Sequence, residues 1–194
     1  MILLSTETVN IFSQNPFAIF FDVWYNYEVD RKDYYAAEKR RNGVFMLNIR
    51  KINPSDRDEY ISMAREFYDT DAVLIHVDDS HFEATFCELI RSEDYAVCYV
   101  FELDGQIAGY SLLAKTYSQE AGGMVMWIEE IYVLPKFRGL GIGREFISSI
   151  LKNRPENVKR FRLEVEKENE GAVRLYKSFG FDFLDYDQMI IDFS

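Results

Sequence analysis

The chain has 194 residues, which is enough for one domain with an added segment and too short for two ordinary domains. Hydrophobic residues make up 48% and charged residues 28%, a globular ratio that excludes wholesale disorder, collagen-like repeats and coiled coils. Acidic side chains outnumber basic ones by 33 to 22, and the resulting net charge of −11 repels a phosphate backbone. We therefore expect no nucleic-acid partner.

Neither the cysteines nor the apolar segments indicate an extracellular or membrane protein. The two cysteines are too few for a disulfide framework, and no Cys or His cluster has the spacing of a metal site. The apolar run at residues 17–21 is too short to cross a membrane and has no basic flank before it. We expect a cytoplasmic protein with no metal and no membrane partner.

Residues 1–43 differ from the rest of the chain. They hold nine aromatic side chains, whereas a disordered tail is normally poor in aromatic residues. We expect this N-terminal extension to pack on the domain behind it or on a second copy of the chain, which makes a homodimer a candidate assembly. Residues 44–194 then form the domain proper.

The first half of that domain has the pattern of two helices and four strands. Cap chemistry in Asn53-Pro54-Ser55 and a turn at Asp104-Gly105 mark two of the boundaries. In chain order the pattern predicts a strand over 44–52, a helix through Ile61 and Tyr68, a helix through Phe82 and Ile90, and antiparallel strands over 95–103, 106–117 and 124–133.

The second half alternates helices with strands. It predicts a helix through Ile142 and Leu151, a strand over 160–165, a helix from Ala172 to Phe179 that stops at Gly180, and two short strands over 181–193. In the middle strand Arg160, Arg162 and Glu164 alternate with apolar residues, so one face meets water. A crossover helix between strands indicates an α/β domain with a mixed sheet.

A glycine-rich loop lies between the strand ending near Val133 and the helix that begins near Ile142. Its glycines let backbone N–H groups approach a phosphate closely, and the helix N-terminus adds positive potential. The loop lacks the Gly-Lys-Ser/Thr ending of a nucleoside-triphosphate loop. On turn chemistry alone it is either an anion cradle or a plain strand-to-helix connection.

The longer string resembles a known family. Arg138-x-x-Gly141-x-Gly143 matches the Gln/Arg-x-x-Gly-x-Gly/Ala signature of the GNAT superfamily of N-acetyltransferases, and residues 129–135 resemble its fourth strand. Residues 169–181 resemble its Asn-x-x-Ala-x-x-x-Tyr-x-x-x-Gly-Phe helix. The resemblance covers residues 44–194 and is nearest to the diamine and small-amine branch. It implies a twisted, mixed and mostly antiparallel sheet of about six to seven strands, splayed between the fourth and fifth and flanked by about four helices.

The resemblance also implies a site for acetyl-CoA, the co-substrate. Backbone groups of Ile131, Tyr132 and Val133 would pair with the pantetheine arm where the strands splay. Asn169 and Ala172 would lie beside the cofactor, although Asn169 is equally suited to cap the following helix. Backbone amides of the loop would hold the pyrophosphate, and these belong to Arg138, Gly139, Leu140, Gly141, Ile142, Gly143 and Arg144.

Two side chains would carry the chemistry that the resemblance implies. Tyr176 would protonate the leaving thiolate, although its place on an apolar stripe also suits core packing. Glu129 matches the base carboxylate of the diamine branch and, by strict alternation, shares its face with Trp127, Ile131 and Val133. Glu130 is the alternate base, because a bulge in this strand would exchange the two faces.

The expected activity is direct transfer of an acetyl group from acetyl-CoA to a primary amine, with a small molecule ahead of a protein N-terminus or lysine. A non-catalytic acyl-CoA sensor or scaffold of the same fold is the alternative from a different class. The acidic loop over 69–79, which contains His76, is a candidate lip for a cationic acceptor. Tyr186 and Asp187 are further candidates for the acceptor cleft.

Overall fold

The computed structural model describes residues 45–70, 77–186 and 188–191. The N-terminal extension, His76 and Asp187 therefore lie outside the described residues. In chain order the elements are β1 (Leu47–Lys51), η1 (Pro54–Asp56), α2 (Arg57–Tyr68), α3 (Asp79–Arg91), β2 (Ala96–Leu103), β3 (Gln106–Ser118), β4 (Gly123–Val133), η2 (Pro135–Phe137), α4 (Ile142–Lys152), β5 (Val158–Leu163) and α5 (Glu170–Lys177). None of the described helices is long and apolar enough to cross a membrane.

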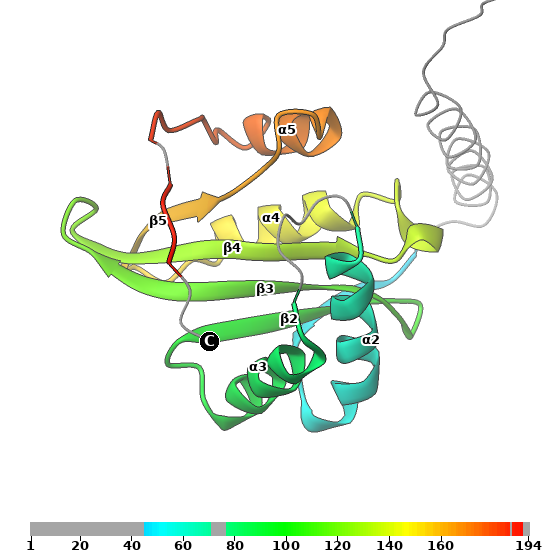
Figure 1. The fold of residues 1–194 in the computed structure, drawn as a ribbon. Coiled ribbons are helices and arrows are strands. Elements are labelled where there is room, and N and C mark those ends of the chain that lie inside the picture. Colours follow the sequence, from blue (N-terminus) through cyan, green and yellow to red (C-terminus); the bar gives the residue numbers. More distant parts are fainter. Residues whose placement is uncertain (1–44, 71–76, 187, 192–194) are drawn as a thin grey trace, which may run out of the picture. The chain divides into compact units, whose positions relative to one another are not determined.

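One twisted sheet organises the domain, with the strands in the order β1-β2-β3-β4-β5 (Figure 1). The first four strands pair antiparallel, and β5 returns through the α4 crossover to pair parallel with β4. The mixed sheet and its four α-helices confirm the expected architecture. The described residues form five strands, fewer than the six to seven expected.

The missing strands are those predicted over 181–193. The described residues of this segment form no strand, so that prediction is wrong for them. Phe183 N–H instead donates to the Asp182 carboxylate at 2.9 Å, a local bond that competes with a strand ladder. Apolar side chains of this segment are exposed, with Met189 at 96% and Ile191 at 76%.

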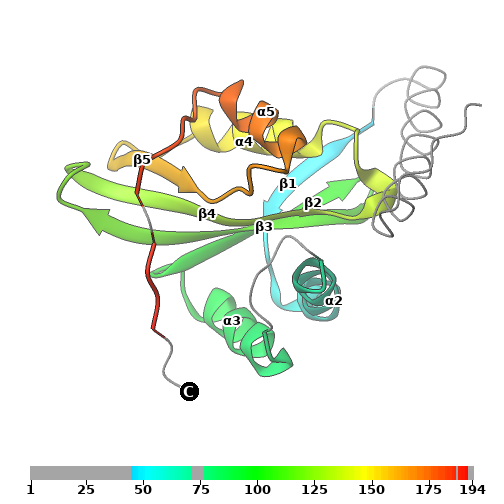
Figure 2. The same cartoon turned by 45° about the horizontal axis from the view of Figure 1, so that its top comes forward.

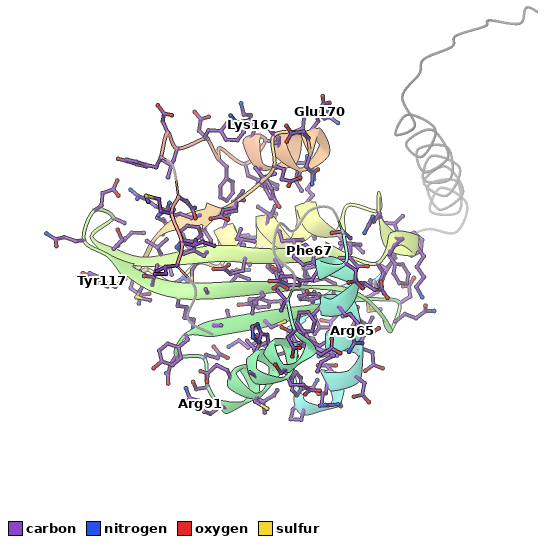
Figure 3. All side chains as sticks on the ribbon, in the orientation of Figure 1. Arg65, Phe67, Arg91, Tyr117, Lys167 and Glu170 are labelled. Atoms are coloured by element: carbon purple, nitrogen blue, oxygen red, sulfur yellow. The ribbon has the colours of Figure 1, made fainter. Side chains whose placement is uncertain are left out.

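Helices cover the sheet on both faces, α2 and α3 on one and α4 and α5 on the other (Figure 2). Each layer has its own apolar core, and side chains fill the space between sheet and helices (Figure 3). Tyr60 packs against both Phe86 and Tyr110 on the first face, while Phe146 packs against Phe101 on the second. The alternation of strand residues between two packed layers explains why the central strands are buried on both sides.

The turn from β1 into α2 is held by the predicted cap. The Asn53 side chain accepts the Ser55 N–H at 2.9 Å, and Asn53 N–H donates to the Asp56 carboxylate at 2.8 Å. This reciprocal pair is a capping box.

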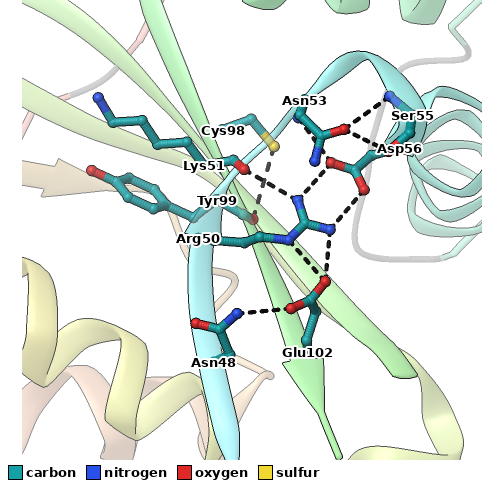
Figure 4. A network of polar contacts seen from close by, with 9 residues as sticks. All are labelled: Asn48, Arg50, Lys51, Asn53, Ser55, Asp56, Cys98, Tyr99 and Glu102. Atoms are coloured by element: carbon teal, nitrogen blue, oxygen red, sulfur yellow. Dashed lines mark hydrogen bonds and ion pairs between the residues drawn. The ribbon is translucent and has the colours of Figure 1, made fainter. Parts of the chain in front are cut away.

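Asp56 also closes an ionic network with Arg50 on β1 and Glu102 on β2 (Figure 4). Two Arg50 nitrogens donate to the Asp56 carboxylate at 2.7 and 2.8 Å, and a third donates to Glu102 at 2.8 Å. Asp56 is only 3% exposed. The hydrogen bonds from Arg50 hold the pKa of Asp56 below its ordinary value, despite the opposing effect of burial.

Asp56→Ala should lower the free energy of unfolding at neutral pH by about 2–4 kcal/mol, because it leaves Arg50 partly buried without its main partner. Since the folded-state pKa of Asp56 is depressed, its stabilisation is present above the unfolded pKa and is lost as the pH falls through the folded pKa. Urea unfolding across that pH range should show that the free energies of unfolding of the wild type and of Asp56→Ala converge as the pH falls. Asp58→Ala, at an exposed ion pair with Arg57, is the matched control. A neutral-pH difference below about 0.5 kcal/mol would contradict this assignment.

Candidate functional site

The site is built where β4 parts from β5. The parallel pairing of the two strands runs from Met124 to Ile128 and stops there. The next residue, Glu129, is a β-bulge, because Leu112 of β3 pairs with Glu130 while Leu113 pairs with Ile128. The pairing of the fourth and fifth strands ends here, as the expected splay requires, and the Glu129 carboxylate lies at this point.

Glu129 is exposed on the bulge. Partial desolvation by the surrounding protein raises the pKa of its carboxyl above the ordinary value, and the nearby Glu164 carboxylate adds to the effect. A carboxylate with a raised pKa holds a proton more readily than a free glutamate does. Glu129 is therefore suited to accept a proton from a bound group at neutral pH.

Glu130 lies in a different environment from its neighbour. It is 6% exposed, and its carboxylate accepts hydrogen bonds from the hydroxyls of Tyr68, at 3.0 Å, and Tyr110. Its backbone carbonyl accepts the Ser111 hydroxyl at 2.7 Å. Burial raises the pKa of Glu130, and the two tyrosine hydrogen bonds partly offset that rise. These contacts fasten the bulge to α2 and β3 and enclose the alternate base in the core.

The bulge also corrects the face expected for Trp127. Ile128 and Ile131 both pack in the α4 layer, whereas strict alternation would put them on opposite faces. Trp127 therefore belongs to the opposite face from Ile131 and Val133, and the prediction that they share a face is wrong. The Arg162 guanidinium lies over the Trp127 ring at 4.2 Å from its centroid.

Tyr176 lies on α5, half-buried against the α4-layer core and packed edge-on to Phe181 with ring centroids 5.9 Å apart. Burial raises the pKa of its hydroxyl, so the phenol stays protonated at neutral pH. No hydrogen-bond partner for this hydroxyl occurs among the described residues, which also contain no buried side-chain polar atom lacking a partner. The hydroxyl is thus accessible, and Tyr176 lines a cavity. Tyr176 therefore packs in the core through its ring and also lines the cavity.

The glycine loop has a backbone suited to an anion. Gly139 and Gly141 have φ values of 79° and 84°, a region in which a side chain would be strained. Helix α4 begins after Gly141 with no side chain capping its first amides. The Arg138 side chain braces the loop by donating from Nε to the Val133 carbonyl at 2.9 Å. Because Arg138 N–H donates to Pro135 at 3.2 Å, its amide already serves the turn of η2.

The other residues predicted to bind the cofactor surround this loop. Ile131, Tyr132 and Val133 pair with β3 and lie beyond the end of the β5 ladder, so their opposite edge has no strand partner among the described residues. Asn169 accepts the Ala172 N–H at 3.1 Å, which confirms it as the cap of α5. Four predicted residues complete the loop and the start of α4, namely Leu140, Ile142, Gly143 and Arg144.

A cavity of about 610 Å³ lies along β5, between α5 and the C-terminal segment. Tyr176 and Tyr186 line it, as do Trp127, Arg162 and Glu164, which sequence reasoning did not place in a site. The one sequence feature that pointed to these residues was the alternation of charged residues in the strand predicted over 160–165, which we interpreted as a face exposed to water.

Comparison with known proteins identifies the family. The sequence model of the Acetyltransferase (GNAT) family matches residues 58–181, which include β4, the glycine loop and α5. The chain belongs to the GNAT family. It is therefore an N-acetyltransferase, and the family's acetyl donor is acetyl-CoA. The edge of β4 beyond the β5 ladder and the amides at the start of α4 fit that donor, because among the described residues the first has no strand partner and the second have no side-chain cap.

Two curated relatives of this GNAT protein act on small amines. Mouse thialysine N-epsilon-acetyltransferase is 30% identical over 141 residues, covering 68% of this chain and 82% of its own. The spermine/spermidine N(1)-acetyltransferase of Bacillus subtilis is 22% identical over 118 residues, covering 56% and 78%. Among solved structures, an aminoglycoside N-acetyltransferase in complex with CoA has a TM-score of 0.63 at 16% identity, covering 78% of this chain and 97% of its own. That likeness supports the fold.

Proposed function

We propose that this GNAT protein transfers an acetyl group from acetyl-CoA by direct attack of a small-molecule primary amine, with Glu129 as base and Tyr176 as acid. One observation carries the proposal: the bulge puts Glu129 at the first residue beyond the β4–β5 pairing. The named substrates of the relatives, thialysine, spermine and spermidine, support a small acceptor. Assembly as a homodimer and location in the cytoplasm remain predictions.

The chemistry divides between the two side chains. Acetyl-CoA supplies the activated acetyl group when bound. A primary amine reaches the protein as a cation and must lose a proton before it can attack, and Glu129 accepts that proton directly or through water. Tyr176, kept protonated by burial, donates a proton to the departing thiolate.

A thiol-release assay with acetyl-CoA tests the acceptor class. We expect rapid release with small primary amines, slow release with peptides that carry a free N-terminus or lysine, and no amine-independent burst. Faster release with the peptides would overturn the small-molecule assignment. Absence of release with every amine would overturn the catalytic assignment and favour an acyl-CoA sensor.

The cofactor site has its own prediction. Acetyl-CoA at about 100 times its Kd should raise the melting temperature of the wild type by about 5–10 °C, because it binds only the folded state. Gly143→Val should abolish most of that rise, because the larger side chain would crowd the space in which the loop holds the pyrophosphate. A Cβ at Gly143 meets only a Leu175 methyl at 3.7 Å, so the fold tolerates the change, whereas φ at Gly141 makes substitution there strained. Differential scanning fluorimetry gives both values, and a full shift in Gly143→Val would place the pyrophosphate elsewhere.

A further inference from the structure

A row of charged residues on β5 and directly after its end lines the cavity beside the proposed reaction centre. Arg160 and Arg162 are alternate residues of β5, so their side chains project from the same face of the strand, and Glu164 follows directly after the strand ends at Leu163. All three line the cavity together with Trp127 and Tyr176. Two cations in one cavity wall are unexpected in a chain with a net charge of −11.

The two arginines differ in how their charge is satisfied. Arg160 pairs with Glu120 through two hydrogen bonds of 3.1 and 3.3 Å. Arg162 is half-buried and lies over Trp127, and Glu120 interacts with it electrostatically, but no hydrogen bond or ion pair to Arg162 occurs among the described residues. Stacking on an indole holds a guanidinium in one plane while leaving its N–H groups available. Arg162 is thus a fixed, partly desolvated donor in a cavity wall, which is the arrangement that binds a carboxylate.

The phosphates of acetyl-CoA are not the anion that Arg162 would bind. Arg162 is level with Trp127 on β4, whereas the glycine loop follows Val133 at the far end of the same strand. Six residues of extended chain separate those two positions by about 20 Å. The anion at Arg162 therefore belongs to the other substrate.

The opposite end of the row is negative. Glu164 follows Arg162 by two residues, which limits their backbone spacing to about 7 Å. The Glu164 carboxylate lies close enough to Glu129 to contribute to the raised pKa of that residue. One wall of the cavity therefore presents a cation at one end and, near the proposed base, carboxylates at the other.

We propose that the acceptor is an amine that also carries a carboxylate, and that Arg162 binds the carboxylate while the amine lies at Glu129. The inference rests on the proposed function and assigns its substrate class. The spacing of the row fits an ω-amino acid with about four to six carbons between the two groups. A diamine of the same length would bring a second cation to Arg162 and is disfavoured by like-charge repulsion.

Three acceptors of equal length test the class, namely the six-carbon ω-amino acid, the six-carbon diamine and hexylamine. We expect the wild type to give the ω-amino acid a kcat/KM about 10-fold or more above that of the diamine. Arg162→Gln should lower kcat/KM for the ω-amino acid by about 10–100-fold and change that for hexylamine by less than about 3-fold. Arg162→Lys, which keeps the charge and is the milder change, should retain the preference over the diamine.

Arg174→Gln is the matched control, since Arg174 is exposed on α5 and pairs with Glu170 at 2.9 Å. It should leave all three acceptors unchanged. A wild-type preference for the diamine would overturn the inference. An equal loss of kcat/KM for all three acceptors in both Arg162 variants would also overturn it, because the stack on Trp127 would then be purely structural. Either result leaves acetyl transfer intact, whereas no thiol release with any acceptor would refute the proposed function as well.

Discussion

Tyr176→Phe should reduce kcat by about 10²-fold or more, because it removes only the proton offered to the leaving thiolate. The ring remains, so its packing on the α4-layer core and its edge-on contact with Phe181 persist. The hydroxyl makes no hydrogen bond to the described residues, so the substitution leaves no buried group without a partner. We therefore expect the melting temperature and the affinity for acetyl-CoA to stay close to those of the wild type.

Steady-state kinetics with a good amine, together with calorimetric titration of acetyl-CoA, separates the two roles of Tyr176. Tyr117→Phe is the matched control, since Tyr117 is 71% exposed near the end of β3 and far from α5 along the sheet (Figure 3). An unchanged kcat in Tyr176→Phe would return this residue to a packing role. Loss of acetyl-CoA affinity with unchanged kcat at saturation would make its hydroxyl a binding group.

Glu129→Gln should lower kcat/KM by about 10²–10⁴-fold for a strongly basic amine. The base must be ionised to accept a proton, so activity in the wild type rises with pH through the raised pKa of Glu129. Glutamine keeps the shape but cannot titrate, and that acidic limb should disappear from the pH profile of the variant. Since Glu129 is exposed on a bulge, its replacement should leave stability nearly unchanged.

An acceptor with a low amine pKa separates the base from the amine's own ionisation. Such an amine arrives neutral, so Glu129→Gln should be nearly normal with it and strongly impaired with a basic amine. Glu166→Gln, at an exposed position beyond β5, is the matched control and should behave as the wild type with both. Equal impairment with both acceptors would make Glu129 a structural residue of the splay.

Local chemistry is what allowed much of the fold to be predicted from sequence. The Asn53 cap and the Asp104-Gly105 hairpin turn depend on residues within a few positions of each other, and both occur as expected. The family motifs around Gly141 and Tyr176 are also contiguous, so the family was recognisable before its fold. The strands expected over 181–193 had no such local support. The described residues of this segment form no strand, and the Asp182 carboxylate accepts the N–H of Phe183.

The two parts of the candidate site, the carboxylates of β4 and the stack of Arg162 on Trp127, could be predicted from sequence to different degrees. The sequence named Glu129 and Glu130 as alternatives, because adjacent strand residues point to opposite faces. The stack of Arg162 on Trp127 has no local signal at all, since it requires the parallel register of β4 with β5.

Register was decided only by the packed sheet. Leu112 and Leu113 pack in different layers, and pairing them with Glu130 and Ile128 inserts one extra residue at the bulge. A shift of one residue exchanges the faces of every side chain beyond it. For that physical reason the sequence determined which two carboxylates could serve, and the tertiary structure alone left Glu129 exposed at the splay and enclosed Glu130 among tyrosines.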